Sequence, residues 1–203
     1  MKKYNNNPNR TYEQYVKHQM IKTTDPNRRK KWVEGGGEWE EKLNGFREIF
    51  NQYDEILSSC KNALCLGART GQEVVALQER GIDAIGIDLV PCKPYVIVGD
   101  IHDLKYEDAS YDFMYTNIFD HCFYPEKFCQ EITRVLKPGG HILMNLPIVN
   151  KWDTYTETIL ESSEDIISLI EDMEVIKNTA IQQNAHAMNW ELLFRRKEIT
   201  NKL

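Results

Sequence analysis

The chain has 203 residues, of which 41% are hydrophobic and 28% charged, a composition typical of a soluble globular protein. One domain of this length buries an adequate core, and no apolar run approaches the roughly 20 residues that cross a bilayer. The net charge of −6 disfavours a protein that wraps nucleic acid, because such proteins present basic surfaces.

The N-terminus carries two lysines without an apolar segment behind them, so we expect no secretory signal and a cytoplasmic protein. Five cysteines without a CxxC pair argue against a disulfide framework and against a thiolate zinc site. Residues 1–47 hold 11 Lys and Arg against 6 Asp and Glu, so this part is basic within an acidic chain. Either a solvated helix face or an anionic substrate or partner accounts for that asymmetry.

A helical segment comes first in the chain. Thr11 and Gln14 match a capping box at the start of a first helix, which Asp25-Pro26 ends. A second, amphipathic helix that packs on the rest of the protein is predicted by apolar residues at alternating steps of four and three: Trp39, Leu43, Phe46, Phe50, Tyr53 and Leu57. We therefore expect a helical cap or lid over residues 1–58 and an α/β domain over residues 59–203.

In that α/β domain, short apolar runs alternate with helical stretches, which is the pattern of a parallel sheet. The expected strands are residues 63–66, 84–87, 95–98, 113–116 and 142–146. Helices are expected at residues 72–80, 126–136 and 164–172, the second of them ended by Pro138-Gly139-Gly140. Two last runs, residues 175–181 and 190–194, predict an antiparallel pair. The expected fold is thus a doubly wound, mostly parallel seven-stranded sheet with a C-terminal antiparallel strand pair and an N-terminal helical cap.

A glycine-rich turn follows the first strand, in the segment LCLGARTGQE from Leu64 to Glu73. A strand that ends in such a turn and opens a helix presents backbone N–H groups to a ligand. Gly67 lets the backbone approach a ligand without a Cβ, and Gly71 permits close packing of the helix. Turns of this kind also occur without a ligand.

Asp88 ends the second strand in the segment AIGIDL, where an acidic side chain can accept hydrogen bonds from both hydroxyls of a ribose. An aspartate at a strand end is often only a turn former. Its position after a glycine turn nevertheless favours a cofactor that contains adenosine.

The segments LCLGARTG, GIDLVP, VGDIHDL, SYDFMYTNIFDH and LKPGGHILMNLP, in this order, resemble class I (Rossmann-like) S-adenosylmethionine-dependent methyltransferases, particularly the small type 11 group. The resemblance covers about residues 60–150. It implies S-adenosyl-L-methionine as cofactor and S-adenosyl-L-homocysteine as product, with the glycine turn at the methionyl part, Asp88 at the ribose and Asp100 at the adenine. The expected cofactor-binding residues are Gly67, Ala68, Arg69, Gly71, Asp88, Leu89, Asp100, Ile101 and Asn117.

The sequence departs from that family pattern at two positions of the turn. Cys65 stands where an acid is usual, and Arg69 stands where a central glycine is usual. Arg69 suggests a salt bridge to the cofactor carboxylate. A dinucleotide-binding oxidoreductase shares the turn and the acid, but the turn reads GxxxG rather than GxGxxG, the chain is short for a substrate domain, and LKPGG is typical of methyltransferases by resemblance.

Asp120 and His121 follow the fourth strand, at the edge where open α/β sheets bind ligands. If the acceptor is a hydroxyl, a base must remove its proton, so His121 is the candidate base, and Asp120 either orients it or contacts the substrate. Both residues could instead only cap the next helix. Asp120, Asn145 and His102 could join a divalent-ion site, but they form no compact cluster in the sequence, and we predict no metal.

The segment YEQYVKHQMIKTTDP, followed by RRKKW, resembles segments that precede methyltransferase domains encoded with glycosyltransferases. This resemblance implies O-methylation of a sugar or glycan hydroxyl, with the acceptor under a lid formed by Tyr15, Gln19, Lys22 and Trp32. Plain helix packing is the alternative for Tyr15 and Trp32. Other acceptors remain open, namely another small molecule, RNA or protein, and so does a non-catalytic scaffold protein that binds the cofactor.

Overall fold

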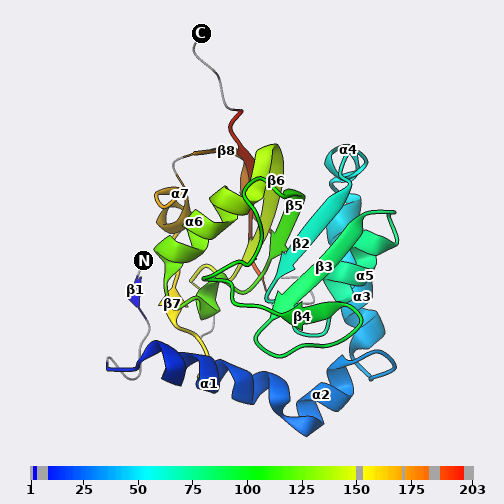
Figure 1. The fold of residues 1–203 in the computed structure, drawn as a ribbon, viewed down its shortest axis with the longest axis vertical. Helices are drawn as coiled ribbons and strands as arrows, with labels where there is room; N and C mark the ends of the chain where they lie inside the picture. The colour runs from blue at the N-terminus through cyan, green and yellow to red at the C-terminus, as the bar shows by residue number, and fades with distance from the viewer. Residues whose placement is uncertain (1, 4–8, 150–152, 171, 183–187, 199–203) are drawn as a thin grey trace.

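The structure is a computed structural model that describes residues 2–3, 9–149, 153–170, 172–182 and 188–198. Within these ranges a seven-stranded sheet carries helices on both faces (Figure 1). Its strands are β2 (Asn62–Leu66), β3 (Asp83–Asp88), β4 (Val96–Val98), β5 (Tyr111–Thr116), β6 (Leu136–Leu146), β8 (Met173–Ala180) and β9 (Trp190–Arg196).

The strand order across the sheet is β4-β3-β2-β5-β6-β9-β8. Strands β2 to β6 are parallel, whereas β9 is antiparallel to both of its neighbours, β6 and β8. The predicted doubly wound sheet with a C-terminal antiparallel pair is confirmed. A separate two-stranded sheet pairs β1 (Lys2–Lys3) with β7 (Thr158–Ile159).

The two faces of the sheet bury separate cores because successive strand residues point to opposite sides. In β2, Ala63 and Cys65 pack with α3 (Trp39–Asn51), α4 (Asp54–Leu57) and α5 (Gln72–Gln78). Leu64 and Leu66 face the other core, which contains buried side chains of α6 (Pro125–Val135) and α7 (Glu164–Ile167). Both faces of the central strand are therefore apolar.

The remaining helices, α1 (Tyr12–Thr24) and α2 (Pro26–Trp32), cross the edge of the sheet where the parallel strands end (Figure 1). The predicted capping box at Thr11 is present, and Asp25 separates the two helices. None of the helices in the described ranges has the length and apolar character needed to cross a membrane.

Three helix boundaries differ from the expectation. The helix expected through Leu57 is interrupted at Tyr53, whose φ of −123° is not helical and whose hydroxyl is held by Glu191. The helix expected over residues 164–172 ends at Ile167, after which the chain continues in tighter turns.

The third difference concerns the end of α6. Proline and the two glycines after it do not terminate this helix, because Leu136 already pairs with Tyr111 as the first residue of β6. Pro138-Gly139-Gly140 lie within the strand.

Candidate active site

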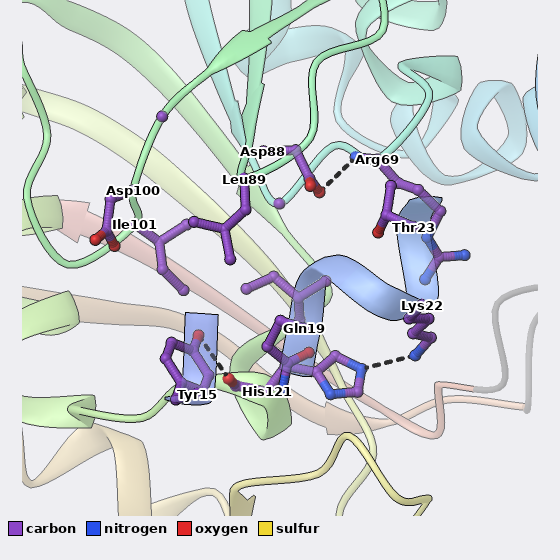
Figure 2. A pocket seen from close by; sticks show the side chains of 13 residues that line it. Tyr15, Gln19, Lys22, Thr23, Arg69, Asp88, Leu89, Asp100, Ile101 and His121 are labelled. Atoms are coloured by element: carbon purple, nitrogen blue, oxygen red, sulfur yellow. Dashed lines mark hydrogen bonds between the residues drawn. The ribbon is translucent and has the colours of Figure 1, made fainter. Parts of the chain in front are cut away.

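A pocket lies at the carboxyl ends of the parallel strands, beneath α1 (Figure 2). Its empty space of about 590 Å³ includes the solvent at its open mouth. The lining residues are Tyr15, Gln19, Lys22, Thr23, Gly67, Arg69, Asp88, Leu89, Gly99, Asp100, Ile101, Ile118 and His121.

Most of the residues expected from sequence meet in this pocket, although they come from five separate segments. The expected residues outside its lining are Ala68, Gly71, Asn117, Asp120 and Trp32. Sequence reasoning missed Thr23, Gly99 and Ile118. Each of these three is a direct neighbour of a residue that was expected, so adjacency on a loop or lid helix was the available signal.

The glycine turn after β2 is anchored to the neighbouring strand. Backbone N–H groups of Gly67 and Ala68 both donate to the carbonyl of Ile87, at 2.9 Å each. Gly67 has a φ of +73°, and a Cβ there would lie 2.3 Å from Cγ1 of Ile118. Only glycine fits this position, because Ile118 packs against its backbone where a Cβ would lie.

We expect Gly67→Ala to lower the free energy of unfolding by roughly 1–3 kcal/mol, through the left-handed φ and the clash with Ile118. Gly37→Ala is the matched control, because its φ is not left-handed and no atom lies within 4 Å of the added Cβ. Urea unfolding of both variants measures the difference. Equal stability of the two would contradict the close approach described for Gly67.

Gly71 and Ala68 shape the turn from behind. Gly71 precedes α5 with a φ of +93°, and a Cβ there would meet Tyr95 Cβ at 2.5 Å. Ala68 is buried, and its methyl group occupies the space over Gly86. Asn117 follows β5 and lies outside the pocket lining. In this structure these residues support the turn and the strand ends rather than line the pocket.

Arg69 departs from the family pattern and has a φ of +47°, a conformation that costs a non-glycine residue about 1–2 kcal/mol. Its guanidinium carbon lies 4.5 Å from the ring centroid of Trp32, a cation–π contact. Trp32, expected to line the acceptor site, lies beneath Arg69 instead, and its carbonyl accepts a hydrogen bond from Gln72 at 2.8 Å. Among the described residues, no carboxylate forms a salt bridge with Arg69.

Asp88 sits at the end of β3 and faces the pocket (Figure 2). The backbone N–H of Arg69 donates to Oδ2, and that of Val90 donates to Oδ1, both at 3.0 Å. A carboxylate offers about four lone-pair positions, so both oxygens keep capacity for a ligand. Burial raises the pKa of Asp88, against these two hydrogen bonds. The carboxylate is fixed in direction by the backbone, as a two-hydroxyl acceptor requires.

Asp100 is held by the cap and by its own strand end. The Tyr12 hydroxyl donates to Oδ2 at 2.5 Å, and the His102 backbone N–H donates to Oδ1 at 2.8 Å. Burial by itself would raise the pKa of Asp100, but hydrogen bonds from His102 and Tyr12 outweigh it and bring the pKa to about 2. Asp100 is therefore ionised at neutral pH, with Ile101 beside it in the lining.

His102 has a structural role in this network. Its Nε2 accepts hydrogen bonds from the backbone N–H groups of Phe123 and Tyr124, each at 3.2 Å, so the proton is on Nδ1, which faces Asp100 at 3.0 Å. Asn145 is engaged elsewhere, with Tyr115 and Glu191. Within the described ranges, no group of three or more His, Cys, Asp and Glu side chains is placed to hold a metal ion.

His121 lies in the short 3-10 helix η1 (Phe119–His121) and points its ring into the pocket (Figure 2). Its Nδ1 is 2.9 Å from the carbonyl of Tyr155, which only accepts, so Nδ1 carries the proton. Nε2 then presents a lone pair to the pocket, 3.4 Å from Nζ of Lys22. This is the tautomer that a general base requires.

Asp120 does not take the orienting position expected for it. Its Oδ2 is 3.8 Å from His121 Nε2, the nitrogen that carries the lone pair, and the Tyr155 carbonyl holds the other nitrogen. Oδ1 of Asp120 is buried without a hydrogen-bond partner in the described structure. Asp120 thus contributes negative charge beside the imidazole, while a backbone carbonyl fixes the ring.

Helix α1 is fastened over the pocket by polar contacts along its length. The Tyr15 hydroxyl donates to the carbonyl of His121 at 3.1 Å, and the Gln19 amide donates to the carbonyl of Tyr155 at 2.7 Å. His18 Nε2 lies 2.6 Å from the carbonyl of Thr154. These contacts tie the cap to the same segment that orients His121.

Comparisons with known proteins agree with this arrangement. Residues 64–144 match the family described as "Methyltransferase domain". An uncharacterized methyltransferase of Mycobacterium tuberculosis is 27% identical over 95 residues, a match that covers 42% of this chain and 39% of the relative. The chain therefore spans about two fifths of the length of this curated relative.

Solved structures resemble most of the chain at low identity. The Burkholderia thailandensis 1,6-didemethyltoxoflavin-N1-methyltransferase, solved with 1,6-didemethyltoxoflavin and S-adenosylhomocysteine bound, has a TM-score of 0.66 at 14% identity, covering 92% of this chain and 89% of that one. A protein from Pyrococcus horikoshii has a TM-score of 0.63 at 15% identity, covering 79% of this chain and 92% of that one.

The strand order, the glycine turn and the acid that ends β3 define a Rossmann-like α/β protein with a pocket at its switch region. Residues 64–144 are similar to the methyltransferase domain family, over about two fifths of the chain. Together with the fold shared with the solved structures, these findings support a class I S-adenosylmethionine-dependent methyltransferase.

Proposed function

We propose that this protein transfers a methyl group from S-adenosylmethionine to a hydroxyl of an acceptor bound beneath α1, with a sugar or glycan hydroxyl as the first candidate. The observation that carries the proposal is a single pocket lined by the glycine turn, Asp88 and His121. His121 has its proton on Nδ1, so Nε2 is free to act as a base. Both halves of a methyl-transfer site are then within reach of one bound cofactor.

The residues present fit that cofactor. Gly67 lines the pocket with its backbone, and Asp88 keeps free acceptor capacity for the two ribose hydroxyls. Asp100 and Ile101 line the pocket where the resemblance puts the adenine. The guanidinium of Arg69 has no described carboxylate partner and is available for the cofactor carboxylate.

When bound, the cofactor supplies an electrophilic methyl group on a sulfonium. In-line displacement needs little side-chain chemistry, so the contribution of the chain is to align the acceptor and exclude water. Helix α1 covers the pocket, with Tyr15 and Gln19 in the lining. His121 Nε2 accepts the proton of the acceptor hydroxyl, and the Tyr155 carbonyl stabilises the resulting imidazolium through Nδ1.

Helix α1 lies over the pocket and contributes Tyr15, Gln19, Lys22 and Thr23 to its lining, which favours a small acceptor such as a sugar over a polymer chain threaded through the site. The net charge of −6 counts against RNA. Another small molecule or a protein side chain is the alternative acceptor. A non-catalytic scaffold protein that binds the cofactor is the alternative from another class.

Methyl-labelled S-adenosylmethionine tests the proposal, incubated with separate pools of monosaccharides, nucleosides, amino acids and peptides. We expect label in the monosaccharide pool and in no reaction without enzyme. If label appears only in another pool, the protein is a methyltransferase but its acceptor is not a sugar. Cofactor binding without transfer to any pool would favour the scaffold.

A separate prediction tests whether Arg69 binds the cofactor carboxylate. Arg69→Gly relieves the left-handed φ and removes the guanidinium, so we expect roughly tenfold weaker binding of S-adenosylhomocysteine without loss of stability. Decarboxylated S-adenosylhomocysteine, measured by the same titration, should bind both proteins equally. A variant that binds S-adenosylhomocysteine as the wild type does would exclude this role.

A further inference from the structure

Two cations point into the same end of the pocket. Lys22 comes from α1 and Arg69 from the turn after β2, and both lie on the side of the pocket away from Asp100 and Ile101 (Figure 2). The Lys22 side chain is only 15% exposed. Burial, and then the charge of Arg69, lowers the pKa of Lys22, as expected of two cations in one confined space.

The existing partners of Lys22 neutralise it poorly. Its Nζ is 3.2 Å from Asp153 Oδ2, but that carboxylate is 50% exposed, and exposed ion pairs stabilise little. Nζ also lies 3.4 Å from His121 Nε2, a neutral acceptor, and the charge of Asp120 acts on Lys22 from further away. Both contacts are long, so an incoming ligand can replace them at small cost.

The charge balance of the pocket changes when the cofactor binds. The charged residues of the lining are Lys22, Arg69, Asp88 and Asp100, which sum to zero. S-adenosylmethionine carries a carboxylate, an ammonium and a sulfonium, and so adds a net positive charge. Outside the lining, Asp120 and Asp153 add negative charge near Lys22. With Arg69 paired to the cofactor carboxylate and the two lining aspartates directed at the adenosine, Lys22 is the lining cation that remains beside the acceptor.

We propose that the acceptor carries an anionic group, a carboxylate or a phosphate, that binds Lys22 next to the hydroxyl that is methylated. The proximity of Nζ to His121 Nε2, 3.4 Å, requires the anionic group and the reacting hydroxyl to be close neighbours in the acceptor. An acid or phosphate ester of a sugar satisfies this requirement, whereas a neutral sugar leaves Lys22 with the half-exposed Asp153 as its ion-pair partner. This inference rests on the proposed function and narrows its substrate class.

Anion binding to the protein saturated with S-adenosylhomocysteine tests the inference, with inorganic phosphate and acetate as probes at constant ionic strength. A ligand that binds the folded protein raises its melting temperature in proportion to occupancy. We expect one of the two anions to raise it, and the larger effect identifies phosphate or carboxylate as the preferred group. Lys22→Gln should weaken the apparent affinity for that anion by roughly tenfold.

Two matched variants complete the experiment. Lys22→Arg keeps the charge and should keep the response, and Lys30→Gln removes an exposed lysine of α2 outside the pocket lining and should change nothing. Titration with S-adenosylhomocysteine is done first on every protein, as a check of folding. Wild type that fails to bind it contradicts the proposed function, whereas binding followed by equal anion responses in all proteins overturns only the anionic acceptor.

Discussion

Replacing His121 by alanine is expected to lower the rate of methyl transfer by roughly 100-fold or more, the usual contribution of a general base. The reason is the geometry at the two ring nitrogens, because Nδ1 is held by the Tyr155 carbonyl and only Nε2 faces the pocket. Affinity for S-adenosylhomocysteine should change little, since none of the cofactor contacts proposed above involves this ring.

Initial rates with a labelled cofactor and calorimetric titration of the product measure the two effects separately. His141→Ala is the control, because His141 pairs in the middle of the sheet and is absent from the pocket lining. Wild-type turnover in His121→Ala would show that His121 is not the general base. Loss of cofactor binding along with turnover would show that His121 supports the site structure instead.

Replacing Asp88 by alanine is expected to weaken binding of S-adenosylhomocysteine by roughly 100-fold, because two charge-assisted hydrogen bonds to the ribose disappear. The substitution also frees the backbone N–H groups of Arg69 and Val90, so a part of the loss comes through the turn. Equilibrium titration followed by intrinsic fluorescence measures the change.

Two further variants separate the ribose contact of Asp88 from its support of the turn. Asp88→Asn keeps an acceptor for the turn and is expected to lose less affinity than alanine. Asp83→Ala, at the exposed beginning of the same strand, should bind as the wild type does. If Asp88→Ala retains wild-type affinity, the ribose contact assigned to this carboxylate is wrong.

The central sheet and its glycine turn are predicted well because short stretches of the sequence determine them. The apolar run of β2 and the glycines at 67 and 71 are recognised from neighbours in the chain, and the left-handed φ at each glycine explains the residue choice. Asp88 at the end of the next strand follows from the same local pattern. Most of the expected cofactor residues therefore meet in one pocket.

Contacts between distant segments could not be read in the same way. The Tyr12 hydroxyl on Asp100 joins residues 88 positions apart, and no local pattern reports it. The Tyr155 carbonyl that orients His121 is a backbone group, which residue types do not reveal. The contact between Trp32 and Arg69 could not be predicted either, because it depends on where tertiary packing places helix α2.

The central claim is that the pocket beneath α1 binds S-adenosylmethionine, and calorimetric titration of the purified wild-type protein tests it most directly. The account predicts binding of S-adenosylmethionine and S-adenosylhomocysteine at one site per chain, with dissociation constants on the order of micromolar. Dinucleotides should not compete. Heat of binding with a nicotinamide dinucleotide, and none with either sulfur cofactor, would contradict the account.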